Sequence, residues 1–173
     1  MKKLMNGAQM KRIDVYSIQE VGIPSLVLME RAALCVTEAV LEKIKKTDKV
    51  LCVCGSGNNG ADGMAVARQL TERGISAEVY TTAEEGKGTE ELNRQRAILQ
   101  KLGIVFVNDI PAGEYNCIID AVFGIGLSRT ITGRYEQIIE KINAAKDTGS
   151  LIVAVDTPSG INAGDGQVMG CAV

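Results

Sequence analysis

Apolar and polar positions divide the chain into alternating segments that predict helices and strands. Apolar residues recur at helical spacing over residues 9–46, with a break at Gly22-Ile23-Pro24, which predicts two helices before the first strand. The second of these has an apolar face made of Met29, Ala32, Ala33, Val36, Ala39 and Val40. Further helices are predicted at residues 63–73, 89–102 and 134–145, and strands at residues 49–54, 76–82, 104–107, 116–122 and 151–155.

This alternation predicts the α/β class, with a mostly parallel sheet flanked by helices. A length of 173 residues fits one domain, residues 1–173, and no linker, repeat or low-complexity segment divides it. The segment Asp165-Gly166-Gln167-Val168 has the composition of a turn that enters a new element, so we expect a domain that lacks its last strands.

Composition narrows the possible chemistry. A net charge of −2 and an aromatic content of 3% without tryptophan argue against a nucleic-acid partner. No segment approaches the ~20 apolar residues of a membrane span, and no signal-peptide pattern follows the basic start, so we expect no membrane partner and a cytoplasmic location. The five cysteines show no metal-ligand spacing and favour structural thiols. Because the chain has no histidine, acid–base catalysis would require Asp, Glu, Lys, Cys or Tyr.

Three glycine-rich or polar segments follow predicted strands, and ligands of parallel sheets bind beyond the carboxyl ends of the strands. The first segment, residues 55–63 (GSGNNGADG), fits GxGxxG between a strand and a helix. Its glycines would let backbone N–H groups approach a phosphate at the start of a helix, which predicts binding of a phosphate-bearing nucleotide. A tight strand-to-helix turn also requires glycines, so a purely structural role stays open.

The second and third segments each place an aspartate at the end of an apolar strand. Asp120 opens residues 120–134 (DAVFGIGLSRTITGR), and Asp156 lies in residues 155–160 (VDTPSG). A carboxylate at such a position is unfavourable unless it is hydrogen-bonded, paired or bound to a cation, and a structural capping role is the alternative for both. If the three segments converge, one pocket is lined by Asn59, Asp62, Asp120, Asp156 and Ser159.

Together these motifs are specific. The segments QMKRIDVYSIQEVGIPSLVLMERAA, GSGNNGADGMAVAR, DAVFGIGLSRTITGRY and VAVDTPSGINAGDGQVMG follow one another, and with them the chain resembles the YjeF N-terminal domain family, the NAD(P)H-hydrate epimerases, which includes the apolipoprotein A-I-binding protein. The resemblance implies a three-layer Rossmann-like fold and an isomerase that interconverts the R and S epimers of hydrated NADH or NADPH in metabolite repair. It also implies a homodimer, and it leaves open whether an NAD(P)H-hydrate dehydratase is fused to the chain or acts as its partner.

The same resemblance implies the substrate and metal ligands. At the matching positions the substrate would contact Asn58, Asn59, Gly60, Ala61, Asp62, Gly124, Ile125, Gly126, Leu127, Ser128, Arg129, Thr130 and Asp156. One potassium ion would be held by Asn59, Asp120 and Ser159, whose oxygen atoms are hard ligands suited to an alkali cation. Ala61 replaces a glycine that is usual in the family and adds a methyl group to the loop.

A mechanism follows from the substrate, which carries a hydroxyl group on the ring carbon beside the nicotinamide nitrogen. We expect Asp156 to protonate the departing hydroxyl and then to accept a proton from the water that adds to the opposite face, with Asp62 as the second candidate. An NAD(P)-dependent oxidoreductase is one alternative, although the second strand ends in Tyr80-Thr81-Thr82 and not in an acidic residue. A non-catalytic interaction module of the same fold is the other.

Overall fold

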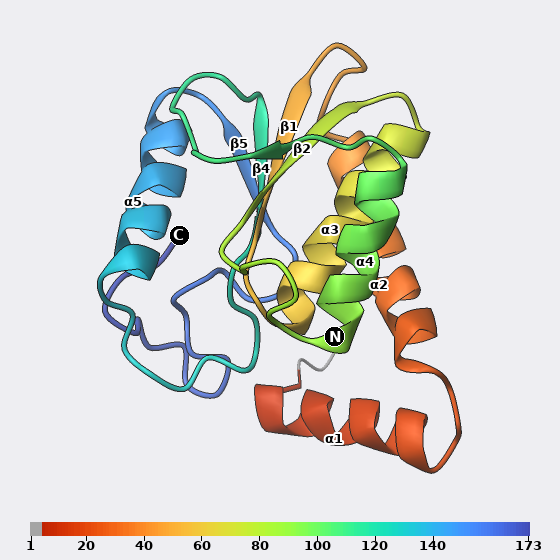
Figure 1. Cartoon of the computed structure of the whole chain (residues 1–173). Coiled ribbons are helices and arrows are strands. Elements are labelled where there is room, and N and C mark those ends of the chain that lie inside the picture. Colours follow the sequence, from red (N-terminus) through yellow and green to blue (C-terminus); the bar gives the residue numbers. More distant parts are fainter. Residues whose placement is uncertain (1–4) are drawn as a thin grey trace.

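The structure, a computed structural model, describes residues 5–173 and contains a five-stranded sheet between two layers of helices (Figure 1). The strands are β1 (Lys49–Cys54), β2 (Ser76–Thr81), β3 (Phe106–Val107), β4 (Cys117–Ala121) and β5 (Leu151–Ala154). The helices are α1 (Gly7–Gln19), α2 (Ser25–Leu41), α3 (Asn58–Glu72), α4 (Glu90–Lys101) and α5 (Arg134–Asp147). All strand pairs are parallel, in the order β3-β2-β1-β4-β5, which confirms the α/β fold with a parallel sheet.

The central strand β1 separates two apolar layers because its side chains alternate between the faces of the sheet. Cys52 and Cys54 pack with residues of α2 and α3 on one face. Leu51 and Val53 pack with α5 on the other. Figure 1 shows this division, with α5 alone on one side and α2, α3 and α4 on the other. The free energy of folding therefore depends on burial on both faces of β1.

Helices α1 and α2 are separated at Gly22, whose positive φ of 83° ends the first of them, as the break in the pattern predicts. Helix α2 packs against α3 and buries Met29, Ala33 and Val40, but Ala32 and Ala39 of the predicted apolar face are exposed. Thr37 is buried instead, because the face of α2 that contacts α3 covers fewer positions than the predicted apolar face.

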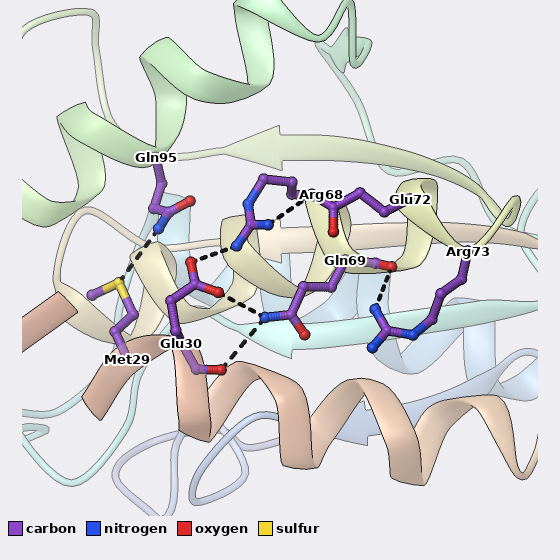
Figure 2. Close-up of polar contacts among 7 residues, drawn as sticks. All are labelled: Met29, Glu30, Arg68, Gln69, Glu72, Arg73 and Gln95. Carbon is purple, nitrogen blue, oxygen red and sulfur yellow. Dashed lines mark hydrogen bonds and ion pairs between the residues drawn. The ribbon is translucent and has the colours of Figure 1, made fainter. Parts of the chain in front are cut away.

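Polar side chains cross the interface between α2 and α3 (Figure 2). Glu30 of α2 pairs with Arg68 of α3, and its second carboxylate oxygen accepts a hydrogen bond of 3.0 Å from Gln69. The Gln95 amide of α4 donates to the Met29 sulfur at 3.9 Å. These contacts fix the position of α3, whose first turn carries residues of the predicted site.

Helix α3 begins at Asn58, five residues earlier than predicted, so most of the predicted glycine-rich loop is helical. The predicted start of α3 was too late because glycine is a poor helix former. In the structure the small size of these glycines permits close packing, which outweighs their low helix propensity. A Cβ atom on Gly60 would lie 2.1 Å from the Gly55 carbonyl oxygen, and one on Gly63 would lie 2.4 Å from Ala121 Cβ. These glycines bring the start of α3 against β1 and β4.

The remaining elements agree with the prediction to within a few residues, except at the sheet edge. Strand β3 has two residues where four were predicted, because it pairs only with β2 and only over Val79–Tyr80. The predicted turn at residues 165–168 is confirmed: Gly166 has a φ of 75°, and Ile161 and Val168 form an isolated antiparallel bridge. Among the described residues, no helix has the combination of length and apolarity that crossing a bilayer requires.

Candidate active site at the carboxyl edge of the sheet

The three segments predicted to converge do meet. Strands β1, β4 and β5 are neighbours in the sheet, and the segments that follow them are joined by hydrogen bonds. Gly55 N–H donates to the Ala121 carbonyl at 2.9 Å, and Phe123 N–H donates to the Ser159 hydroxyl oxygen at 2.8 Å. The chain reverses its direction of winding between β1 and β4, the position at which open α/β sheets bind ligands.

Asp120 lies at the centre of this edge and is completely buried. Its carboxylate accepts hydrogen bonds from the Ser159 hydroxyl at 2.5 Å and the Ser159 N–H at 2.7 Å, and a longer one from Val122 N–H at 3.3 Å. Burial raises the pKa of Asp120, and these hydrogen bonds oppose the rise. Within residues 5–173 no lysine or arginine pairs with it.

Asn59, in the first turn of α3, carries a buried amide whose oxygen and nitrogen both lack a hydrogen-bond partner. A buried amide without partners is unfavourable, so a ligand or ion is expected beside it. A Cβ atom built on Gly124 would lie 3.2 Å from Asn59 Oδ1 and 2.5 Å from Asp156 Oδ2. Asn59 and Asp156 therefore face the same glycine from opposite segments.

Two further carboxylates lie at this edge in different environments. Asp156 is exposed, and its Oδ2 accepts a hydrogen bond of 2.8 Å from Ile125 N–H, which holds the segment after β4 against the one after β5. Asp62 is half-buried on α3, where burial, and then the negative charges of Asp156 and Asp14, raise its pKa to about 7. A carboxyl group with this pKa can donate and accept a proton near neutral pH.

The predicted substrate contacts fall into two groups. Gly60, Ala61 and Leu127 are buried in the core, so a ligand would meet these positions through the backbone. The others are at least partly accessible and lie on the first turn of α3 and on the segments after β4 and β5; they are Asn58, Asn59, Asp62, Gly124, Ile125, Gly126, Ser128, Arg129, Thr130 and Asp156.

A hollow of about 250 Å³ lies over the segment after β4. The predicted contacts Leu127, Arg129 and Thr130 line part of it, and the remainder is lined by Phe123, Ile131, Thr132 and Tyr135. Sequence reasoning missed these four, although Phe123 and Tyr135 flank the glycine-containing motif. Their rings lie 4.9 Å apart and give the hollow an aromatic wall.

Helix α1 also reaches the site, which the sequence did not indicate. In Figure 1 it lies beside the edge at which the strands end. Gly7 N–H donates to the Ala163 carbonyl at 3.4 Å, and a Cβ atom on Gly7 would lie 3.3 Å from Ile125 Cβ. Asp14 of the same helix is close enough to Asp62 for its charge to raise the Asp62 pKa.

The fold and these loops define a Rossmann-like α/β protein with a polar candidate site at the switch point of its sheet. A family model for the YjeF-related protein N-terminus matches residues 25–173, and the chain belongs to this family.

Similar proteins agree with this assignment. The chain is 41% identical to the NAD(P)H-hydrate epimerase of Limosilactobacillus fermentum over 174 residues, which cover 99% of this chain and 82% of that protein. It is 41% identical to the NAD(P)H-hydrate epimerase of Oenococcus oeni over 171 residues, 98% of this chain and 80% of that protein. The crystal structure of yeast ynu0, YNL200c, matches with a TM-score of 0.87 at 23% identity, covers 99% of this chain and 77% of that one, and so shares the fold.

Proposed function

We propose that this chain is an NAD(P)H-hydrate epimerase, an isomerase that interconverts the R and S epimers of hydrated NADH and NADPH and so serves metabolite repair. Its relatives of that name match nearly the whole chain. The structural observation that carries the proposal is the juxtaposition of Asp62, with a pKa of about 7, and Asp156 beside Gly124 at the ligand edge. A non-catalytic interaction module has no need of a half-buried carboxyl group whose pKa is raised, as that of Asp62 is.

The reaction needs one group that gives and takes a proton. Protonation of the hydroxyl on the carbon beside the ring nitrogen lets it leave as water, and the nitrogen lone pair stabilises the planar cation. Water then adds to the opposite face and loses a proton, which inverts the centre without redox change. The raised pKa favours Asp62 as the proton carrier. Asp156, the first candidate from the sequence, accepts a hydrogen bond from the Ile125 amide, and its negative charge adds to the effect of burial in raising the Asp62 pKa.

The substrate itself would lie along the first turn of α3 and the segment after β4. Asn58 is exposed and a Cβ atom on Gly57 would meet nothing within 4 Å, so a phosphate group can approach these backbone amides at the start of a helix. The hollow with its aromatic wall offers an apolar surface to one of the rings of the dinucleotide.

Asn59, Asp120 and Ser159 would hold a potassium ion. The fit rests on the unpartnered Asn59 amide oxygen and on the buried Asp120 carboxylate, which lacks a cationic neighbour among the described residues. When bound, the ion would supply the positive charge that the buried Asp120 carboxylate lacks. We expect potassium chloride to raise the melting temperature relative to choline chloride at equal ionic strength, and Asp120→Asn to remove the difference. A parent protein with equal melting temperatures in both salts would rule the site out.

The setting of the enzyme is proposed on the same basis. Eight of the exposed large apolar side chains lie within residues 5–27, a concentration that supports a homodimer contact through α1 and its flanks. All five cysteines are free, which supports a reducing cytoplasmic location. An NAD(P)H-hydrate dehydratase, fused or separate, is the proposed functional partner, because an epimerase is useful to an enzyme that accepts one epimer.

The direct test is to add the purified chain to a single separated epimer of hydrated NADH or NADPH. Formation of the other epimer, followed by chromatography, should be faster than the spontaneous interconversion in a matched sample without protein. A rate equal to the spontaneous one for both substrates, with folded protein, would reject the proposed function. Reduction of an added carbonyl compound by NAD(P)H, or oxidation of an added alcohol by NAD(P)⁺, would instead indicate the oxidoreductase alternative.

A further inference from the structure

A buried positive charge lies at the carboxyl end of β2 without a negative partner. Arg96, on α4, has 7% of its surface exposed. Its Nη2 donates to the Ala83 carbonyl at 2.6 Å and approaches the Thr81 hydroxyl at 3.5 Å, while its Nε has no acceptor. Among residues 5–173 no carboxylate forms an ion pair with it. A buried guanidinium in this state is unfavourable, which indicates that a negative group belongs beside it.

A second unpartnered donor lies at the same strand end. Thr82 is 7% exposed, and its hydroxyl has no hydrogen-bond partner. Its N–H donates to the Cys54 carbonyl at 2.9 Å, so it lies beside the end of β1. Thr82 is therefore a second buried, unpartnered donor at the carboxyl end of β2, and it follows Thr81, whose hydroxyl Arg96 contacts.

This place adjoins the proposed phosphate-binding turn. Thr89 N–H donates to the Ser56 carbonyl at 3.2 Å, and a Cβ atom on Gly88 would lie 2.7 Å from the same oxygen. The turn after β2 is thus packed on the turn after β1. A dinucleotide whose reacting ring lies between Asp62, on α3, and Asp156, after β5, would have its other half directed over β2.

In Rossmann-like sites the end of the second strand meets the ribose of the adenosine half, where a carboxylate accepts the 2′-hydroxyl and a nearby arginine accommodates a 2′-phosphate. Here β2 ends at Thr81, which is not acidic and whose hydroxyl contacts Arg96. The planar fork of arginine suits a phosphate group. The geometry points to Arg96, which contacts the Thr81 hydroxyl and the Ala83 carbonyl, as the recognition residue for the 2′-phosphate of hydrated NADPH, so this chain prefers that substrate to hydrated NADH. This inference rests on the proposed function.

The test uses two probes that differ only in the 2′-phosphate, adenosine 2′,5′-bisphosphate and adenosine 5′-monophosphate. By calorimetry the parent protein should bind the bisphosphate at least about tenfold more tightly. Arg96→Gln should weaken binding of the bisphosphate by about 10–100-fold and leave the monophosphate within about threefold. Arg96→Lys keeps the positive charge but not the planar fork of the guanidinium. Its affinity for the bisphosphate should therefore lie between those of the parent and of Arg96→Gln. The same variants should show the same change in kcat/KM for hydrated NADPH relative to hydrated NADH.

Arg94→Gln is the matched control, because Arg94 lies on the same helix but is exposed and, within residues 5–173, pairs only with Glu90. It should bind both probes as the parent does. Equal affinity of the parent for the two probes would overturn the inference, whether or not the Arg96 variants fold. An Arg96→Gln protein that loses both probes equally would overturn it as well, since Arg96 would then only support the turn. If the parent epimerises neither substrate but discriminates between the probes, the proposed function fails and the subsite stands.

Discussion

The two glycine-containing segments of the site use glycine for opposite purposes. At the start of α3, Cβ atoms on Gly60 and Gly63 would overlap the neighbouring chain at 2.1 and 2.4 Å. After β4, a Cβ atom on Gly126 would meet nothing within 4 Å. The first segment is locked against the sheet at Gly60 and Gly63, whereas the second is open to solvent at Gly126. A shared residue type in two motifs therefore does not indicate a shared role.

The comparison also explains where the reacting groups lie. Asn59 and Asp62 belong to the locked segment, so their side chains start from a backbone with little freedom. The open segment supplies Arg129 and Thr130 and most of the hollow. The proposed function thus assigns proton transfer to the closely packed segment and substrate contact to the more open one, which suits a reaction that needs one positioned proton carrier.

The largest expected effect comes from the proton carrier of the locked segment. Asp62→Asn should lower the rate of epimerisation by about 10²–10⁴-fold, because an amide can neither give nor take the proton. Asp156→Asn should lower it less, since Asp156 acts on Asp62 through its charge. Both rates are measured against spontaneous interconversion. A larger loss for Asp156→Asn would restore the assignment that the sequence favoured.

The packing difference itself predicts the next effect. Gly60→Ala should lower the free energy of unfolding by about 1–3 kcal/mol, because the added methyl group meets backbone and outweighs the better helix propensity of alanine. Gly126→Ala should stay within about 0.5 kcal/mol. Urea denaturation of the two variants measures the difference. Equal stability would mean that the start of α3 is not locked.

The stability of the protein should depend on pH through Asp62, which lies on the closely packed segment at the start of α3. The folded-state pKa of Asp62, about 7, lies above the value of 3.8 for an ordinary aspartate, so folding favours its protonated form. The contribution of Asp62 to stability is complete below about pH 4 and is lost as the pH rises through about 7. Denaturation midpoints between these values should decline more steeply for the parent than for Asp62→Asn. Parallel curves would contradict the raised pKa.

The smallest effect is expected at Ala61. Its side chain is completely buried in the core cluster between α3 and the sheet, so it is not accessible to a ligand at the carboxyl edge of the sheet. Ala61→Gly should therefore change nucleotide affinity by less than about tenfold, or ~1.4 kcal/mol. Titration with NADP⁺ provides the measurement, and a much larger gain in affinity would show that the methyl group obstructs the substrate.

The local pattern of apolar residues was sufficient to predict an element that is buried on both of its faces. The apolar run of residues 49–54 became β1 with the predicted bounds, and the positions of Asp120 and Asp156 at strand ends followed from the same patterns. The start of α3 was missed because helix propensity counts against glycine, whereas the contact of Gly63 with Ala121 depends on a strand more than fifty residues later.

Two parts of the site depend on tertiary structure alone. Nothing near Asp14 in the sequence indicates that α1 returns to the carboxyl edge of the sheet. Likewise, an arginine in the middle of a predicted helix is ordinarily solvated, and only the packing of α4 over the end of β2 shows that Arg96 is buried without a counter-charge. Periodicity reports which face of a helix is apolar, but it does not report what that face meets.

The open segment after β4 also bears on how such a protein can diversify. A position where an added methyl group meets nothing, as at Gly126, tolerates substitution at little loss of stability, while the start of α3 does not. Randomised libraries limited to the exposed positions 126, 128–130 and 132 would therefore sample altered dinucleotide preferences among folded proteins, with Asp62 and Asn59 left untouched. A natural lineage faces the same asymmetry, so sequence drift within this fold should concentrate on these exposed positions and spare the start of α3.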